Sequence, residues 1–349
     1  MRKSLLDISW QVTEEEYRAD PALSYSTLSK YEKGGFNSLD KIFDKIETPS
    51  LTFGSAVDSI ITGGQEEFEE RFLVADIPEV SDKIMTITKI LFDRYKEQYR
   101  TVNDIPETDL ANIGKECDFW AGDKYANHRV KLIKEGCNTI YNLMYLAMDK
   151  TIIDTKTYND ILETVHILRY SDSTKFYFAE NNPFDKNIER YYQLKFKATI
   201  EGIEYRCMAD DIIVDHENKV VIPTDLKTSS KPEWDFFKSF IDWNYSIQAR
   251  LYWAIIRQNM DKDDYYKDFK LLDYRFIVVN RKTLLPLVWE YPHTKTVGTL
   301  YYGKNKQIIC RHPFEIGKEL YHYLNNKPTV PMGIHVKEKN NLVDWLNNM

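Results

Sequence analysis

The stretch that decides the fold is NIERYYQLKFKATIEGIEYRCMADDIIVDHENKVVIPTDLK, residues 187–227. Apolar and polar side chains alternate along its first part, which is typical of a β-strand with one buried face. Glu201-Gly202 and His216-Glu-Asn218 are turn-forming sequences that divide the stretch into three runs. The pattern therefore predicts a meander of three strands, the last of which ends in Pro223-Thr-Asp225-Leu-Lys227.

Helical and strand patterns continue on both sides of this meander. A helical stretch from about Glu233 to Asn259, with a break near Asn244, precedes two strand candidates at Leu271–Asn280 and Leu284–Tyr291. Upstream, apolar residues three and four positions apart predict mainly helices. The expected helices are Ser26–Lys33, a short one from Phe53 that closes at Gly63-Gly64, Ser81–Tyr99, Val130–Met148 and Tyr158–Tyr170.

These elements predict an α/β fold, in which a central mixed sheet is flanked by helices and the N-terminal half is largely helical. We expect residues 1–290 to form one domain that includes a helical insertion at about 80–185. Residues 291–349 are expected to be a mostly helical extension of the same domain.

Composition and charge exclude several classes of protein. The chain of 349 residues is 43% hydrophobic and carries a net charge of −7, so it cannot bind nucleic acid by bulk positive charge. It contains no apolar run long enough to span a membrane and no signal-peptide pattern, so we expect a cytoplasmic protein without membrane contact. The four cysteines are far apart in the sequence, which favours free, reduced thiols.

The end of the meander gathers polar groups that could perform chemistry. Strand alternation places Asp225 and Lys227 on one face, and Asp210 lies on the preceding strand. Two carboxylates and one amine can therefore converge at one end of the sheet. Carboxylate oxygens hold Mg²⁺, and an amine can orient the water that attacks a phosphate, so the set suits metal-assisted phosphodiester hydrolysis.

Residues before and after the meander extend this candidate site. Glu189 opens the first strand and could supply a third carboxylate. Gln248 and Tyr252 share one helix face because they are four residues apart. Together with Arg250 and Arg257 they give this helix a polar, aromatic and basic character.

These residues, in this order, resemble the PD-(D/E)xK nuclease superfamily. The similar positions are Gly54-x-x-x-Asp58, Glu189, Asp210, Asp225-x-Lys227 and Gln248-x-x-x-Tyr252. Within that superfamily, the segments Ser24–Tyr31 and Phe53–Ile61 also resemble the branch of RecB-like and RecE-like (exonuclease VIII) phage exonucleases. The resemblance spans roughly residues 22–290.

The resemblance implies a restriction-endonuclease-like core and a metal-dependent DNA exonuclease that resects double-stranded ends for recombination or replication. It implies Mg²⁺ as the cofactor, which Mn²⁺ could replace, held by Asp58, Asp210, Asp225 and the backbone carbonyl of Leu226. Lys227 would then act at the attacking water, with Glu189 near the metal. The DNA-facing residues would be Gln248, Tyr252 and Arg250. The same resemblance implies linear double-stranded DNA as a partner, a single-strand annealing protein as another, and a ring-shaped homo-oligomer.

Two positions depart from the family pattern. The family usually has a histidine where this chain has Asp58, although aspartate is also a competent ligand for Mg²⁺. Asp210 and Asp211 are adjacent and point to opposite faces of a strand, and we choose Asp210 because the family pattern continues with any residue and then an aliphatic one. Two alternatives stay open: a structure-specific or single-strand nuclease on the same fold, and a catalytically silent homologue that binds DNA ends or a protein.

Other motifs give no support to further cofactors. Residues 298–305, GTLYYGKN, imitate a phosphate-binding loop, but Asn305 stands where Ser or Thr should bind Mg²⁺, so we expect no ATP site. The histidines lack the paired spacing of a zinc site. Only Cys310 follows the Asp225–Lys227 strand, so we expect no Fe–S cluster of the kind that related CRISPR-associated exonucleases carry.

Overall fold

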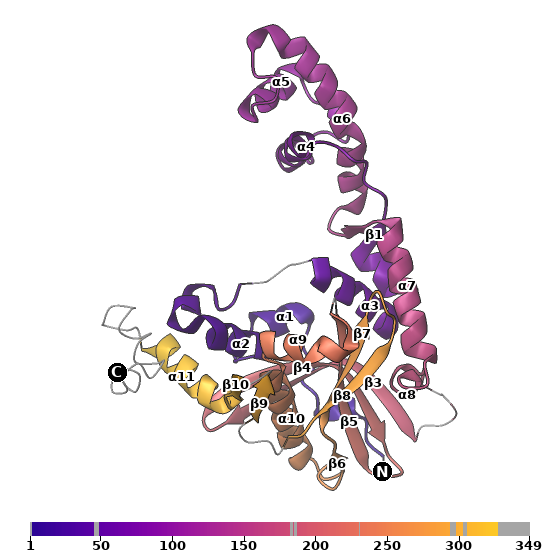
Figure 1. The fold of residues 1–349 in the computed structure, drawn as a ribbon, viewed down its shortest axis with the longest axis vertical. Coiled ribbons are helices and arrows are strands. Elements are labelled where there is room, and N and C mark those ends of the chain that lie inside the picture. Colours follow the sequence, from indigo (N-terminus) through magenta and orange to yellow (C-terminus); the bar gives the residue numbers. More distant parts are fainter. Residues whose placement is uncertain are drawn as a thin grey trace. The chain divides into compact units, whose positions relative to one another are not determined.

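The computed structural model describes most of the chain (Figure 1). The described residues are 2–44, 49–181, 184, 187–229, 231–293, 298–302 and 306–326. Gly303, Lys304 and Asn305 of the loop-like motif, and residues 327–349 of the expected C-terminal extension, lie outside them. No helix in the described ranges is long and apolar enough to cross a membrane.

The chain folds into two compact units. The first contains residues Met1–Gly54 and Thr164–Met349, and the second contains Ser55–Glu163. The expected helical insertion at about 80–185 overlaps the second unit, but this unit begins about 25 residues earlier and ends before the loop that precedes the sheet. Helix α3 (Pro49–Arg71) and helix α7 (Thr155–Tyr170) each contribute residues to both units.

The second unit is built mainly from helices. Its helices α4 (Asp82–Tyr95), α5 (Glu107–Glu116) and α6 (Ala126–Ala147) pack around a buried apolar cluster. Short strands β1 (Phe72–Val74) and β2 (Thr151–Ile153) pair in parallel. The 3₁₀ helices η3 (Val102–Asp104) and η4 (Asp123–Tyr125) connect the larger helices. The unit therefore has a hydrophobic core of its own.

The first unit contains a six-stranded mixed sheet with the order β3-β4-β5-β7-β8, and β6 pairs beside β5. The strands are β3 (Ile188–Ile200), β4 (Ile203–Asp215), β5 (Val220–Ser229), β6 (Lys270–Leu271), β7 (Tyr274–Asn280) and β8 (Pro286–Tyr291). Neighbouring strands are antiparallel except that β5 runs parallel to β6 and β7. This confirms the predicted meander and the predicted α/β class with a central mixed sheet.

Helices cover this sheet and close its core (Figure 1). Helix α10 (Tyr245–Asp261) packs on β3, β4 and β7, and its apolar residues join the main core with Phe196, Tyr205 and Phe276. The other helices of the unit are α1 (Glu14–Ala19), α2 (Tyr25–Gly34), α8 (Lys175–Phe178), α9 (Phe236–Asp242) and α11 (Pro313–Asn325), with 3₁₀ helices η1 (Leu5–Ile8), η2 (Gly35–Lys41) and η5 (Glu233–Asp235).

The structure confirms one predicted helix break, has a kink at one predicted helix end, and has a hairpin near the C-terminus where helix was expected. The predicted break at Asn244 is confirmed, because this residue has a φ of 55° between α9 and α10. At Gly64 (φ 74°) the predicted helix end is a kink, after which α3 continues to Arg71. The expectation of a mostly helical C-terminal extension is wrong in part, because β9 (Gly298–Tyr302) and β10 (Lys306–Cys310) form an antiparallel hairpin. Aromatic and β-branched residues favour strands here.

The turn between β3 and β4 gives a direct test of the meander. Glu201 and Gly202 have φ values of 51° and 80°, which two-residue hairpin turns require. A Cβ added at Gly202 would meet no atom within 4 Å. We therefore expect Gly202→Ala to cost about 1 kcal/mol of unfolding free energy through backbone strain alone, and Gly202→Asn to cost less, measured by urea unfolding. Equal stability of all three proteins would contradict this turn geometry.

Candidate functional site

Strands β4 and β5 separate in the middle of the sheet, and this fork organises the candidate site. Their pairing ends at Asp211 opposite Thr224. Beyond that pair, β5 continues beside β7, while β4 receives Leu23, whose amide donates to the Glu204 carbonyl at 3.0 Å. Asp210 and Asp225 are the first residues past the last β4–β5 pair. The fork therefore places two carboxylates where the backbone ladder stops.

The side chain of Asp210 replaces one of the backbone hydrogen bonds that β4 and β5 no longer form beyond Asp211 and Thr224. Its Oδ2 accepts a hydrogen bond from the Leu226 amide at 3.2 Å, so the side chain crosses the gap from β4 to β5. The amide of Leu226 thus faces the fork. In a strand, the carbonyl of a residue faces the same edge as its amide, so the Leu226 carbonyl is directed to the fork as well.

Asp225 sits beneath α10 with both carboxylate oxygens engaged. The side chain is 1% exposed. Its Oδ1 accepts a hydrogen bond from Gln248 Nε2, and its Oδ2 forms an ion pair with Lys227 Nζ. The structure therefore brings Asp210, Asp225 and Lys227 together, as the alternation of the strand predicts. Gln248 joins them from the helix.

The surroundings of Lys227 keep it positively charged. Burial disfavours its charged form and is the largest single effect, but the negative charges of the neighbouring groups, with Asp225 foremost, together outweigh burial and raise the pKa of Lys227 well above its ordinary value. Its Nζ lies 4.9 Å from the centre of the Tyr245 ring, a favourable cation–π distance. A protonated amine has no lone pair to accept a proton. In this state Lys227 can orient a water or balance negative charge, but it cannot act as a base.

A tyrosine pair that sequence reasoning did not single out closes this corner. Tyr25 lies 6.4 Å from Tyr245 between ring centres, and its hydroxyl donates to the Trp243 carbonyl. Ser29 Oγ donates to the same carbonyl at 3.1 Å. Helix α2 therefore fixes the α9–α10 corner, from which Tyr245 and Gln248 reach the fork. The segment Ser24–Tyr31 carried the only signal, as part of the family resemblance.

The expected DNA-facing residues of α10 are buried. Gln248, Tyr252 and Arg250 are 3%, 8% and 4% exposed. Gln248 binds Asp225, and Tyr252 packs edge-on against Tyr274 with ring centres 5.9 Å apart. The expectation that Arg250 contacts DNA is wrong for this structure, because its guanidinium is enclosed. Residues two apart on a helix point to nearly opposite sides, so Arg250 turns away from Gln248.

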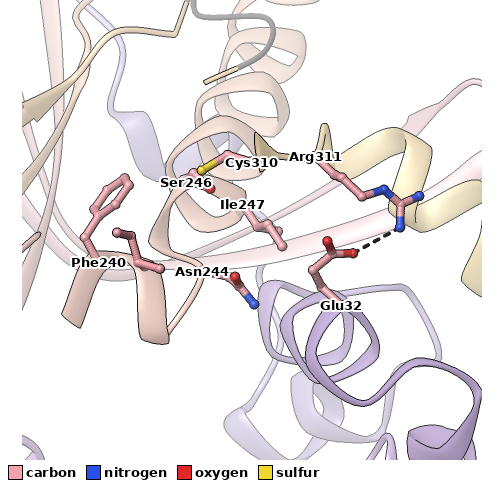
Figure 2. A pocket seen from close by; sticks show the side chains of 8 residues that line it. Glu32, Phe240, Asn244, Ser246, Ile247, Cys310 and Arg311 are labelled. Carbon is pink, nitrogen blue, oxygen red and sulfur yellow. Dashed lines mark hydrogen bonds and ion pairs between the residues drawn. The ribbon is translucent and has the colours of Figure 1, made fainter. Parts of the chain in front are cut away.

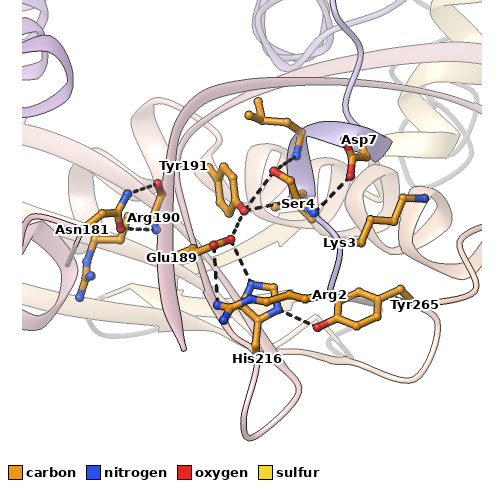
Figure 3. Close-up of polar contacts among 12 residues, drawn as sticks. Arg2, Lys3, Ser4, Asp7, Asn181, Glu189, Arg190, Tyr191, His216 and Tyr265 are labelled. Atoms are coloured by element: carbon orange, nitrogen blue, oxygen red, sulfur yellow. Dashed lines mark hydrogen bonds and ion pairs between the residues drawn. The ribbon is translucent and has the colours of Figure 1, made fainter. Parts of the chain in front are cut away.

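Glu189 belongs to a different cluster, which corrects its expected role as a third carboxylate (Figure 3). In the β3–β4 register it stands opposite Val214, four residues from Asp210, or about 13 Å along the strand. Its Oε2 accepts from the Tyr191 hydroxyl and lies 3.1 Å from His216 Nε2. His216 Nδ1 in turn lies 2.9 Å from the Tyr265 hydroxyl. Glu189 therefore fastens the end of the hairpin.

The remaining candidates lie elsewhere. Asp58 is half-buried on α3 in the second unit, beside buried Val57, and its part in the site stays a prediction. Asp211 accepts from the Thr224 hydroxyl at 2.9 Å on the other face of the sheet, which supports the choice of Asp210. Arg257 forms an ion pair with Asp261. All four cysteines are free, as predicted.

The fork offers a partial metal site. In the part of the chain that the structure describes, no three His, Cys, Asp or Glu side chains are grouped closely enough to hold a metal. Asp210, Asp225 and the Leu226 carbonyl nevertheless supply three hard oxygen donors. Mg²⁺ usually takes one or two protein carboxylates and completes its shell with water and phosphate oxygens. These donors fit Mg²⁺ in that mode.

Comparison with solved structures finds distant structural likenesses. A crystal structure of a candidate exonuclease from Eubacterium rectale aligns with 95% of this chain and 88% of its own, at 14% sequence identity and a TM-score of 0.40. No family model matches the chain, and no curated protein matches it.

The Glu189–His216 cluster predicts how stability depends on pH. Burial opposes ionisation of Glu189, but hydrogen bonds from Tyr191 and His216 lower its pKa overall, and burial lowers the pKa of His216. Both groups bind protons more weakly in the folded chain than in the unfolded one. Their stabilisation is therefore present above the unfolded pKa values, about 6.5 and 4.5, and is lost as the pH falls below them.

We expect the melting temperature to fall between about pH 7 and pH 4, and His216→Asn to flatten the upper part of this fall. His322→Gln, at an exposed position on α11, is the matched control and should keep the parent's pH dependence. An unchanged slope in His216→Asn would show that this cluster does not govern acid stability.

Proposed function

We propose that this chain is a metal-dependent deoxyribonuclease that degrades linear DNA from its ends. The observation that carries the proposal is the fork, which joins Asp210, the Leu226 carbonyl, Asp225 and a cationic Lys227 at one place. Polar chemistry of this kind, concentrated where a backbone ladder stops, is costly to fold without a use. The family resemblance of the same residues adds the substrate class.

Each residue has a chemical task in this proposal. Asp210, Asp225 and the Leu226 carbonyl would hold Mg²⁺, which when bound supplies positive charge to the phosphate and acidifies a water. Lys227, already protonated, holds the attacking water or a phosphate oxygen by donating hydrogen bonds. The water oxygen forms a bond to phosphorus as the bond to the leaving oxygen breaks. The water's proton leaves to solvent or to a phosphate oxygen.

Gln248 acts as a positioning residue. Its amide donates to Asp225 Oδ1, and this contact selects one orientation of the carboxylate. The ion pair from Lys227 to Oδ2 must loosen when a metal approaches the same oxygen. The amine is then free to turn toward the substrate. The Lys227–Asp225 ion pair is therefore the arrangement that we propose for the site before metal and substrate bind.

A catalytically silent protein that binds DNA ends is the second candidate. It is favoured by Asp225, whose two oxygens are both occupied by Gln248 and Lys227. The sequence resemblance supports three further proposals: end resection in phage-type recombination, an annealing-protein partner and a ring-shaped oligomer. The composition supports a cytoplasmic location. The direction of degradation, 5′ to 3′ or 3′ to 5′, follows from the end-labelled cleavage assay described next.

The test is cleavage of a linear duplex labelled at either the 5′ or the 3′ end, with Mg²⁺ or with EDTA. We expect Mg²⁺-dependent shortening from the ends and no cleavage of closed circular DNA. Asp210→Asn, Asp225→Asn and Lys227→Met should each lower the rate by about 10³-fold or more, because each removes a group that holds the metal or the water. Melting temperatures of the variants check that they fold.

Glu189→Gln is the matched control, since it neutralises a carboxylate on the same hairpin but away from the fork. It should keep a cleavage rate near that of the parent. Full activity in Asp225→Asn would remove the fork as the active site. No cleavage by the parent, together with retained binding of DNA ends, would select the silent protein instead.

A further inference from the structure

Helix α10 carries a buried cation that the proposed nuclease chemistry does not use. Arg250 is 4% exposed, and its Nε, Nη1 and Nη2 atoms are buried without a hydrogen-bond partner in the structure. A guanidinium stays protonated in proteins. A buried charge that lacks both a counter-charge and hydrogen bonds strongly destabilises a fold. The position of Arg250 therefore calls for a negative group.

A second unsatisfied donor lies in the same region. Tyr291 on β8 is 5% exposed, and its buried hydroxyl also lacks a hydrogen-bond partner. Arg250 interacts electrostatically with Tyr291: burial raises the pKa of the Tyr291 hydroxyl, and the positive charge of Arg250 opposes this rise. Arg250 also interacts electrostatically with His312: burial lowers the pKa of the His312 imidazole, and the positive charge of Arg250 lowers it further. Arg250, Tyr291 and His312 together present donors and positive charge.

The acidic residues that the structure describes around Arg311 and His312 do not fill this need. Residues 294–309, TKTVGTLYYGKNKQII, include no Asp or Glu. Glu32 forms an ion pair at 3.1 Å with Arg311, which also pairs with Glu319. Glu315 and Glu201 act on His312 but form no contact with Arg250, and Glu201 is paired with Lys318 at 2.9 Å. The counter-charge must therefore come from outside this part of the chain.

A small cavity lies beside this region (Figure 2). It has about 20 Å³, enough for a water-sized group, and the residues that line it include Glu32, Ser246, Ile247 and Arg311 but neither Arg250 nor Tyr291. Ser246 and Ile247 precede Arg250 by one helical turn. Helical side chains lean toward the N-terminus of their helix, so Arg250 leans toward the turn that carries Ser246 and Ile247.

We infer that Arg250 and Tyr291 form an internal binding site for a small inorganic anion. The anion would accept hydrogen bonds from the guanidinium and from the tyrosine hydroxyl, both of which are buried without a partner. Chloride and phosphate share this chemistry, whereas the enclosed position excludes a nucleotide. The inference does not depend on the proposed nuclease function, because Arg250 points away from Gln248 and the fork.

The experiment measures thermal unfolding of the full chain at constant ionic strength. Sodium gluconate, whose bulky organic anion cannot enter a buried site, is replaced stepwise by sodium chloride or by sodium phosphate. We expect a saturable rise in melting temperature of about 2–4 °C with at least one of the two anions. The anion that gives the rise identifies the ligand as a halide or an oxyanion.

Variants decide where the anion binds. Arg250→Met should lose the rise, and in gluconate alone it should be at least as stable as the parent, since an unpaired buried charge has been removed. Tyr291→Phe should weaken the dependence about tenfold in anion concentration. Arg257→Met is the matched control on the same helix, because Arg257 already pairs with Asp261, and it should behave like the parent.

Three results would overturn the inference. One is a parent protein whose melting temperature does not respond saturably to either anion. Another is an equal response in Arg250→Met. The third is an Arg250→Met protein that is much less stable than the parent in gluconate, together with an unchanged anion response in Tyr291→Phe, because Arg250 would then be stabilised by the fold itself.

Discussion

The hydrogen bond from the Leu226 amide to Asp210 is the interaction on which the site depends. It lies at the point where β4 and β5 stop pairing, and it keeps the two strands close after their backbones have separated. Without it, the Leu226 amide would lose its partner at the fork, and buried backbone groups without partners are rare. The same contact sets Asp210 beside Asp225. One polar side chain thus serves both the sheet and the candidate site.

Helix α10 holds the other side of the site. It supplies Gln248 to Asp225 from one face, while its buried apolar residues belong to the core of the first unit. Its start is fixed by Asn244 in a left-handed conformation and by α2, which binds the Trp243 carbonyl through Tyr25 and Ser29. The position of the carboxylates therefore depends on contacts between segments more than 200 residues apart.

Local sequence patterns were sufficient for much of this arrangement. Alternation along residues 187–227 predicts the meander, because the period of a strand is visible in a single sequence. It also predicts that Asp225 and Lys227 share a face. The role of Glu189 could not be obtained in this way, since it depends on the register between β3 and β4, which puts Val214 opposite it. Register is a property of two strands together.

The sequence itself argues against two of the expectations that the structure contradicts, namely Arg250 beside Gln248 and a helix at residues 298–310. Gln248 and Arg250 are two residues apart on a helix, so helical geometry alone places them on different sides. The strand-favouring residues Thr299, Tyr301 and Tyr302 precede a turn-like sequence, which favours the observed hairpin over a helix. The Leu23 bridge that keeps β4 apart from β5 had no local signal, because it joins the N-terminal segment to a strand about 180 residues later.

A metal ion at the fork can be detected in a crystal structure of the full chain grown with Mn²⁺, measured for the anomalous scattering of manganese. We expect a manganese peak within bonding distance of Asp210, Asp225 and the Leu226 carbonyl, with Asp225 released from Lys227. A fork without manganese at saturating Mn²⁺, or a peak bound only by other residues, would contradict this expectation.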